Sequence, residues 1–228
     1  MGGVKGIFHP HFSNFQLFKD LGFNYVEVSL GIGILDFENL AIVLDQAHAL
    51  GLNVFLNPGF DQNFINAYYF LKNARVHPDD IIFICDEPND RKIPKKDVDR
   101  WARLSKHFFP KNKTMLTLTA SAPWAYANLT DIAAIDYYGP LKWIDRFKLD
   151  LKVKMMKKVH KGQVFGIPPV RNSMSEMLEY FELWQRMKAD GILWYSATPE
   201  QEKPPWFPGN LADTRMAQEA LKIANGRT

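Results

Sequence analysis

The sequence predicts a single α/β domain, a closed (β/α)8 TIM barrel, and two observations lead to that prediction. Short apolar, β-rich runs alternate with helical patterns from one end of the 228-residue chain to the other. One of these runs, Ile81–Cys85, is apolar at every position, which is typical of a parallel strand covered on both faces. Regular alternation of strands and helices indicates a parallel sheet with helices packed on it.

Eight strands can be placed at nearly even spacing along the chain. Their expected ranges are Val4–Phe8, Tyr25–Leu30, Asn53–Leu56, Ile81–Cys85, Met115–Thr119, Ile132–Tyr137, Val164–Ile167 and Ile192–Tyr195. The third run closes at Asn57-Pro58-Gly59, a strong turn signal. Strands of this length and spacing are those of an α/β domain.

A helical pattern follows each strand. The expected ranges are Phe12–Leu21, Phe37–Leu50, Asn63–Asn73, a helix from Pro94 through Phe108, a short piece over Pro123–Leu129, and then Leu141–Val159, Met177–Lys188 and Leu211–Ala224. In the second of these, Leu40, Leu44 and Ala47 recur at helical spacing and Gly51 is the expected C-cap. Ser173 or Ser175 is expected to cap the helix over 177–188.

The eight units show no linker and no break in composition, so we expect one domain over residues 1–228. A closed barrel fits eight units better than an open doubly wound sheet. The open sheet would also need a glycine-rich phosphate-binding turn after a strand, and Gly31-Ile32-Gly33 does not supply the full pattern.

Composition excludes several classes of function. A net charge of +3, with both signs mixed along the chain, gives no case for a nucleic-acid partner. The single Cys85 excludes an intramolecular disulfide and a cysteine-based zinc site. No stretch approaches a membrane span, so we expect no membrane partner. The first residues lack the apolar core of a signal peptide, so the expected location is cytoplasmic unless the chain is a domain excised from a secreted protein.

The most informative residues follow the fourth predicted strand, where the apolar run ends in Asp86-Glu87-Pro88-Asn89. Acids placed where a buried strand emerges are costly unless they are paired, hydrogen-bonded or used. In a (β/α)8 barrel, the C-terminal ends of the strands form the face on which active sites are built. These two acids are therefore candidate functional groups.

Other polar and aromatic side chains are expected at the same end of the barrel. They are His9, Glu27, Asn57, Asp136, Tyr138, Arg171 and Trp194. An aromatic ring such as that of Trp194 can stack on a pyranose, while fixed polar groups bind its hydroxyls. Hydrolysis of a glycoside needs two carboxyl groups, one protonated and one ionised. A neighbouring negative charge raises the pKa of a partly buried acid and so keeps a proton donor available.

Over essentially its whole length the chain resembles the (β/α)8 glycoside-hydrolase superfamily. The matching phrases are residues 18–26, residues 47–54, Asp86-Glu87-Pro88-Asn89, Ile135-Asp136-Tyr137-Tyr138 and residues 191–196. In the large retaining clan of that superfamily, strand four ends in Asn-Glu-Pro and its Glu is the general acid/base. The resemblance therefore implies this role for Glu87, with Asp86 in place of the usual Asn.

The chain departs from that clan at strand seven, where the clan carries its nucleophilic Glu. Residues 164–171 contain no acid. Asp136 is our choice for the second carboxylate, because it ends a strand beside two phenols; Glu27 and Asp86 remain alternatives. Assistance by an N-acetyl group of the substrate would dispense with a protein nucleophile. A non-catalytic carbohydrate-binding or structural barrel also stays open.

A metal site is the third hypothesis for the function. His9-Pro10-His11 after the first strand is similar to the start of the metal site in metal-dependent amidohydrolases. The other histidines fall on helices or helix ends, and a metal site needs at least three protein ligands. We therefore expect no metal and no cofactor.

The resulting hypothesis is an enzyme, a glycoside hydrolase acting on an oligo- or polysaccharide. Glu87 is the expected general acid and Asp136 the second carboxylate. The expected substrate contacts are His9, Glu27, Asn57, Asp86, Tyr138, Arg171 and Trp194.

Overall fold

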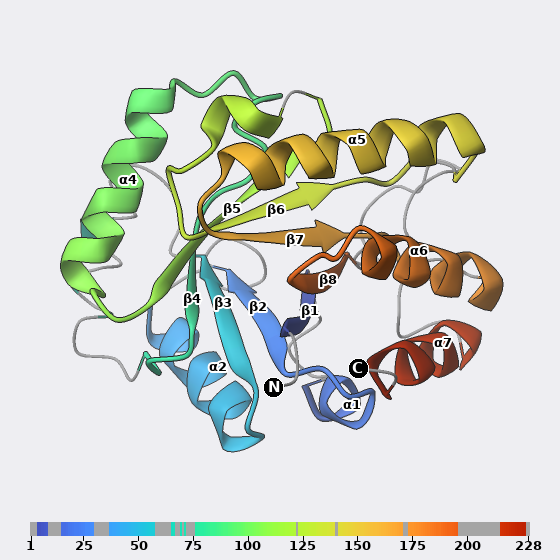
Figure 1. Cartoon of the computed structure of the whole chain (residues 1–228). Helices are drawn as coiled ribbons and strands as arrows, with labels where there is room; N and C mark the ends of the chain where they lie inside the picture. The colour runs from blue at the N-terminus through green and yellow to red at the C-terminus, as the bar shows by residue number, and fades with distance from the viewer. Residues whose placement is uncertain are drawn as a thin grey trace.

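Eight parallel strands close into a barrel in the computed structural model of the chain, as predicted (Figure 1). The structure describes residues 4–8, 15–29, 37–57, 65–66, 69, 71, 76–121, 123–139, 141–170, 173–195 and 215–226. The strands are β1 (Val4–Phe8), β2 (Tyr25–Ser29), β3 (Asn53–Asn57), β4 (Ile81–Cys85), β5 (Lys113–Thr119), β6 (Ile132–Asp136), β7 (Gln163–Ile167) and β8 (Gly191–Tyr195). The ring closes where β1 pairs with β8, from Val4 opposite Gly191 to Phe8 opposite Tyr195.

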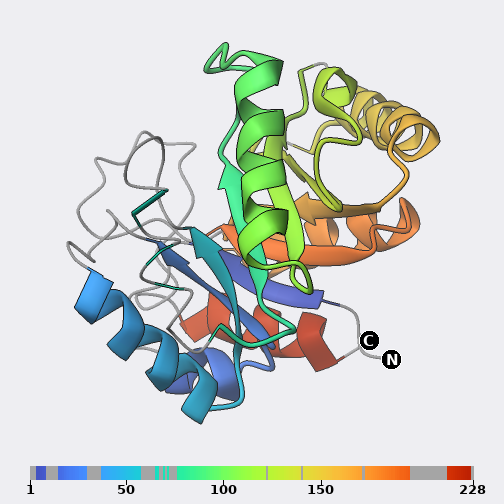
Figure 2. The same cartoon turned by 90° about the vertical axis from the view of Figure 1, so that its left-hand side faces the viewer.

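Helices surround the strands, and Figure 2 shows α4 lying along β4 and β5. The helices are α1 (Phe15–Asp20), α2 (Phe37–Ala49), α4 (Lys95–Phe108), the short 3-10 helix η2 (Pro123–Tyr126), α5 (Trp143–Val159), α6 (Met174–Arg186) and α7 (Arg215–Gly226). Ser173, one of the two expected caps, accepts a hydrogen bond from the Glu176 N–H at 3.4 Å. Most of the helix expected over 63–73 lies outside the described residues. Within the described part of the chain, no helix is long and apolar enough to cross a membrane.

Two apolar layers follow from the alternation of side chains along each strand. The inner layer fills the barrel with Phe8, Phe55, Ile81, Phe83, Met115, Ile132, Ala134, Phe165, Ile167 and Leu193. The intervening residues, such as Val54 and Leu56 of β3, join the larger layer between strands and helices. Gly6 makes room for the inner layer, because a Cβ there would lie 2.4 Å from the Phe55 ring. The interior is therefore a packed and largely apolar core.

The last helix closes the ring against the first βα unit. The Lys5 ammonium of β1 donates to the backbone carbonyl of Asn225 in α7. The Asn225 side chain donates in turn to the carbonyl of Leu21, at 2.9 Å. These two bonds join segments from opposite ends of the sequence, so the barrel is closed by side chains as well as by strand pairing.

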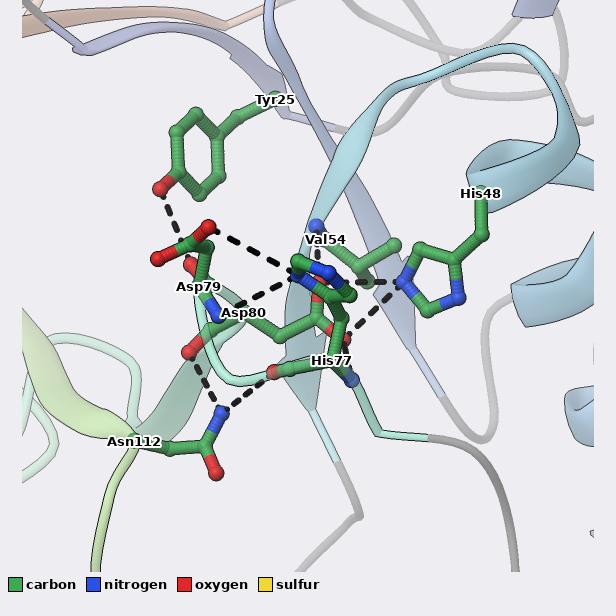
Figure 3. A network of polar contacts seen from close by, with 7 residues as sticks. All are labelled: Tyr25, His48, Val54, His77, Asp79, Asp80 and Asn112. Atoms are coloured by element: carbon green, nitrogen blue, oxygen red, sulfur yellow. Dashed lines mark hydrogen bonds and ion pairs between the residues drawn. The ribbon is translucent and has the colours of Figure 1, made fainter.

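A network of polar contacts occupies the N-terminal ends of β3, β4 and β5 (Figure 3). Asp80, 1% exposed, accepts the backbone N–H groups of Val54 and His77, each at 2.8 Å. His48 of α2 lies 3.0 and 3.1 Å from the two Asp80 oxygens, and this hydrogen bond raises the pKa of His48 above its ordinary 6.5. Asn112 donates to the carbonyls of His77 and Asp80, at 2.8 and 2.9 Å. The network ties α2 and three strands together at this end of the barrel.

Candidate active site

The opposite end, which we call the mouth, is formed by the last inward residues of the strands and the residues just after them. These are Phe8, Ser29, Asn57, Asp86, Glu87, Thr119, Asp136, Tyr138, Ile167 and Tyr195. Most of the polar ones come from β2 through β6. Within the part of the mouth that the structure describes, carboxyl groups are concentrated where β4 and β6 end.

A β-bulge at the end of β4 decides which acid faces inward. Phe83 pairs with Met115 and Cys85 with Leu116, so β4 has one more residue than β5 over this step. Ile84 and Cys85 accordingly both pack in the outer layer. Bulges re-aim side chains and are common beside active sites. The extra residue brings Asp86, rather than Glu87, into step with the inner face of β5.

Asp86 is held from two sides. The Thr117 hydroxyl of β5 donates to its Oδ1 at 2.6 Å. The Arg91 guanidinium forms an ion pair with its Oδ2. The Asp86 side chain remains 35% exposed, so one part of the carboxylate is still open to a ligand.

The loop after β4 is fastened to β5. The Asn89 amide donates to the Thr119 hydroxyl at 2.7 Å and to the Ser121 carbonyl at 2.8 Å. The Tyr126 hydroxyl of η2 donates to the Ile93 carbonyl at 2.6 Å. Because Glu87 belongs to this loop, these hydrogen bonds fix the backbone position from which the Glu87 side chain extends.

Glu87 adopts a backbone conformation that L-residues rarely take, with φ of 46°. Its N–H donates to the Thr117 carbonyl at 3.2 Å, which holds the residue in that conformation. Its half-buried side chain is hydrogen-bonded to Asp136. Burial raises the pKa of Glu87, and the negative charge of Asp86 raises it further. Strained backbone of this kind gathers at functional sites.

Asp136 ends β6 on the inner face and is 6% exposed. Burial raises the pKa of Asp136 well above its usual range, and the charges of Asp86 and Glu87 add to this. The Tyr138 side chain is hydrogen-bonded to Asp136. The Asp136 Oδ1 atom is buried without a hydrogen-bond partner among the described residues. A buried oxygen without a hydrogen-bond partner is costly, so this end of β6 is held at some expense of stability.

The direct hydrogen bond between Glu87 and Asp136 is closer than either familiar arrangement of glycosidase carboxyls. Retaining pairs stand about 5–5.5 Å apart and inverting pairs about 6.5–9.5 Å apart. Two carboxylates in contact repel each other strongly when both are ionised, and this repulsion contributes to the raised pKa of Asp136. Glu87 and Asp136 thus form a carboxyl dyad on one side of the mouth, and do not flank a bond between them.

Two tyrosine rings line the mouth beside the dyad. Tyr138 and Tyr195 lie with ring centroids 5.1 Å apart at 34°. Of the two phenols after β6, Tyr138 packs with the inner layer and Tyr137 with the outer one, as alternation requires. Burial raises the pKa of Tyr138 well above its usual value, so its hydroxyl stays a donor. Tyr195 was not among the predicted contacts, although it ends a predicted strand.

The structure places Trp194 away from the mouth, contrary to the prediction that its ring is a sugar platform. Trp194 is 1% exposed and packs in the outer layer. The pairing of β8 with β1 puts Leu193 and Tyr195 on the inner face instead. β8 is apolar or aromatic at each position after Gly191, so its sequence held no alternation from which to assign the faces.

Glu27 and Asn57 lie on the inner face of β2 and β3, the positions expected for them. Glu27 is 3% exposed and accepts a hydrogen bond from the Ser29 hydroxyl. Asn57 pairs in register with Ser29, one step nearer the mouth than Glu27. His9 and Arg171, the remaining predicted contacts, lie outside the described residues.

The seventh strand offers no acid. β7 ends at Ile167, which packs in the inner layer, and Pro168 follows. Among the described residues, no three His, Cys, Asp or Glu side chains are grouped so as to hold a metal ion. Among the described residues, the mouth groups suited to acid–base chemistry are Asp86, Glu87, Asp136 and the tyrosines.

No protein-family model matches the sequence, and no curated protein matches it. Solved structures do match. A GH113 β-mannanase from Alicyclobacillus acidocaldarius, in complex with ManMIm, aligns at a TM-score of 0.71 and 12% identity, covering 100% of this chain and 97% of that one. Another GH113 β-1,4-mannanase aligns at a TM-score of 0.69 and 11% identity, covering 100% and 99%. A GH2 β-galacturonidase from Eisenbergiella tayi aligns at 0.68 and 13%, covering 100% and 51%. The protein has the (β/α)8 barrel fold of these glycosidases.

Proposed function

We propose that the protein is a glycoside hydrolase that cleaves bonds in an oligo- or polysaccharide, with Glu87 as its general acid. The observation that carries the proposal is the dyad of Glu87 and Asp136 at the mouth. A carboxyl whose pKa is raised by burial and by a neighbouring negative charge is suited to protonate a leaving glycosidic oxygen.

The two members of the dyad differ in access. Glu87 is half-buried and stands on the loop after β4, whereas Asp136 is 6% exposed on β6. Glu87 is therefore the member that would meet the substrate. Asp136, with Tyr138 bonded to it, would keep a proton available to Glu87. Asp136 thus remains the second carboxylate of the proposal, acting through Glu87.

The remaining proposed contacts would bind the sugar. They are His9, Glu27, Asn57, Asp86, Tyr138 and Arg171, to which the structure adds Tyr195. The tilted pair of Tyr138 and Tyr195 would present an aromatic face beside the proton donor. The fold likeness to mannanases and a galacturonidase supports a carbohydrate ligand and makes β-1,4-mannan and galacturonides sensible first substrates.

The test is hydrolysis of a panel of oligosaccharides and aryl glycosides by the wild-type protein and by Glu87→Gln. We expect Glu87→Gln to lower kcat/KM by roughly 10² to 10⁴, the usual contribution of a general acid. Glu182→Gln, which changes an exposed acid on α6, is the matched control and should hydrolyse at the wild-type rate. Equal rates for Glu87→Gln and wild type on a hydrolysed substrate would sink the proposal.

One observation favours a second function, a carbohydrate-binding barrel without turnover. The end of β7 carries Ile167 and Pro168 in place of an acid. In that case calorimetry would detect binding of an oligosaccharide that is never hydrolysed, and Glu87→Gln would not weaken the binding.

A further inference from the structure

Helix α5 has two apolar faces. One packs against the barrel through Leu149, Val153 and Met156, all of them buried. On a helix with 3.6 residues per turn, a second set of apolar side chains falls on the opposite side, and all of its members are exposed. We call this side the outer face of α5; its apolar residues are Trp143, Ile144, Phe147, Leu151, Met155 and Val159.

The outer face is large and strongly exposed. Trp143 is 78% exposed, Phe147 61% and Leu151 50%. The 17 residues of the helix extend about 26 Å, and the apolar side chains run along its whole length. Figure 1 shows α5 on the outside of the barrel, next to β7. A long apolar patch with charged residues around it is typical of a surface that binds a protein or a membrane.

The charges on the outer face are of one sign. Lys148, Lys154 and Lys158 are exposed and lie between the apolar side chains. Lys154 is paired with Asp150 at 2.6 Å, whereas Lys148 and Lys158 form no ion pair with any described residue. The two acids of the helix, Asp145 and Asp150, are half-buried beside the face. A surface that complements this face is therefore apolar and negatively charged.

The residue types on the outer face favour a lipid surface over a protein. Protein interfaces are enriched in Arg and depleted in Lys. Here the free charges belong to Lys, and the single arginine of the helix, Arg146, is half-buried and paired with Glu179. A Lys side chain lays its apolar stem beside buried groups while its ammonium reaches a headgroup, and Trp is enriched at membrane–water interfaces. A second copy of the chain would bring lysines against lysines in a symmetric contact.

We propose that the outer face of α5 binds the surface of a membrane that contains anionic lipids. The apolar side chains enter the boundary between headgroups and acyl chains, and Lys148 and Lys158 contact lipid phosphates. The expectation of no membrane partner was based on the absence of a spanning segment, which binding at the surface does not require. The proposal concerns the side of the barrel and is independent of the glycosidase function proposed for the mouth.

The test is co-sedimentation of the purified protein with two kinds of vesicle. One kind is phosphatidylcholine alone, and the other is three parts phosphatidylcholine to one part phosphatidylserine. We expect binding to the mixed vesicles only, weakening as salt is added because salt screens the attraction between lysines and lipid. Tryptophan emission should shift to shorter wavelength on binding. Trp143→Phe, which stays aromatic, should bind without most of that shift.

Two double variants test the face itself. Phe147→Ser with Leu151→Ser should raise the dissociation constant for the mixed vesicles at least about tenfold, because two apolar side chains no longer enter the membrane. Lys148→Gln with Lys158→Gln should raise it about 25-fold, or about fivefold for each lysine.

Matched controls change exposed residues of the same types on other helices. They are Ile42→Ser on α2, where Ile42 is 54% exposed, and Lys95→Gln with Lys96→Gln on α4. Both controls should bind as the wild type does. Every replaced side chain is exposed, so we expect all variants to fold, and circular dichroism checks this.

Binding to the mixed vesicles that both double variants weaken and both controls retain supports the proposal. Binding to neither kind of vesicle, equal binding to both kinds, or binding that the α5 variants retain overturns it. A dimer in analytical ultracentrifugation that Phe147→Ser with Leu151→Ser dissociates, without vesicle binding, would assign the face to a second copy instead. Binding of a polyglutamate peptide without vesicle binding would assign it to an acidic protein.

Discussion

Two buried acids, one at each end of the barrel, differ in their hydrogen bonds and in the charges around them. Asp80 at the start of β4 is 1% exposed, and both of its oxygens accept hydrogen bonds. Asp136 at the end of β6 is 6% exposed, keeps Oδ1 unpartnered among the described residues, and faces the charges of Asp86 and Glu87. Asp80 has donors on both oxygens, whereas Asp136 has one oxygen without a partner and lies beside two other acids.

The difference indicates what each end of the barrel is for. A buried carboxylate with all its bonds made stabilises the fold, whereas one left short of partners beside other acids is held at a cost in stability. In barrels of this kind the N-terminal face contributes mainly stability and the C-terminal face the chemistry. Substitutions at the two acids should therefore change the free energy of unfolding in opposite directions.

The largest expected effect is that of Asp80→Ala. It leaves the Val54 and His77 N–H groups and the His48 ring without their acceptor, so we expect a loss of about 3 kcal/mol in the free energy of unfolding. Urea unfolding followed by circular dichroism measures it. Asp79→Ala is the matched control, because that neighbouring side chain is 71% exposed, and should cost less than about 0.5 kcal/mol. Equal losses for the two variants would contradict the structural role of Asp80.

Asp136→Asn should act in the other direction, raising the free energy of unfolding by about 1 kcal/mol while abolishing hydrolysis. The pKa of Asp136 is raised in the folded protein, so the unfolded chain releases this proton first as the pH rises. Protonated Asp136 therefore stabilises the folded state fully at pH values below its ordinary pKa of 3.8. This stabilisation is lost as the pH rises toward the raised pKa that Asp136 has in the folded protein. The advantage of Asp136→Asn should grow over that range. Unfolding curves at a series of pH values would refute this if the variant were less stable throughout.

The smallest expected effect concerns His48, whose pKa is raised by its hydrogen bond to Asp80. The stability that protonated His48 contributes is complete below its ordinary 6.5 and is lost as the pH rises through the folded value. His48→Gln should remove this part of the pH dependence, which amounts to less than about 1 kcal/mol. In an Asp80→Ala background the same substitution should leave the pH dependence unaltered. A pH slope that survives in His48→Gln would assign it to another group.

The fold was predictable because strand and helix patterns alternate regularly, and the strand ends agree with the prediction to within two residues. The inner positions of Glu27 and Asn57 were predictable as well, since β2 and β3 place polar residues in step with a period of two. Asp136 is the single polar residue of β6, so its place at the end of the strand, and not a period, made it a candidate. Trp194 was misplaced because an apolar strand shows no such period, and its faces are set by pairing with β1.

The pairing of individual side chains could not be predicted. Nothing in Ile81–Cys85 marks a bulge, because all five residues are apolar and the irregularity arises from packing against β5. The contact of His48 with Asp80 joins α2 to β4 across 32 positions and depends on the closed barrel. The contact between Glu87 and Asp136 likewise exists only once β4 and β6 end at the same mouth.

The bulge at the end of β4 also bears on how distant relatives should be aligned. One extra residue reverses the parity of every position that follows, so in this chain Asp86, and not Glu87, is in step with the inner face of β5. A homologous barrel without the bulge would put its second acid in that place. In two barrels with the same Asp-Glu sequence, the inward-facing acid can therefore be the first in one and the second in the other. Equivalent residues in such motifs should be assigned from strand pairing and not from the count of residues.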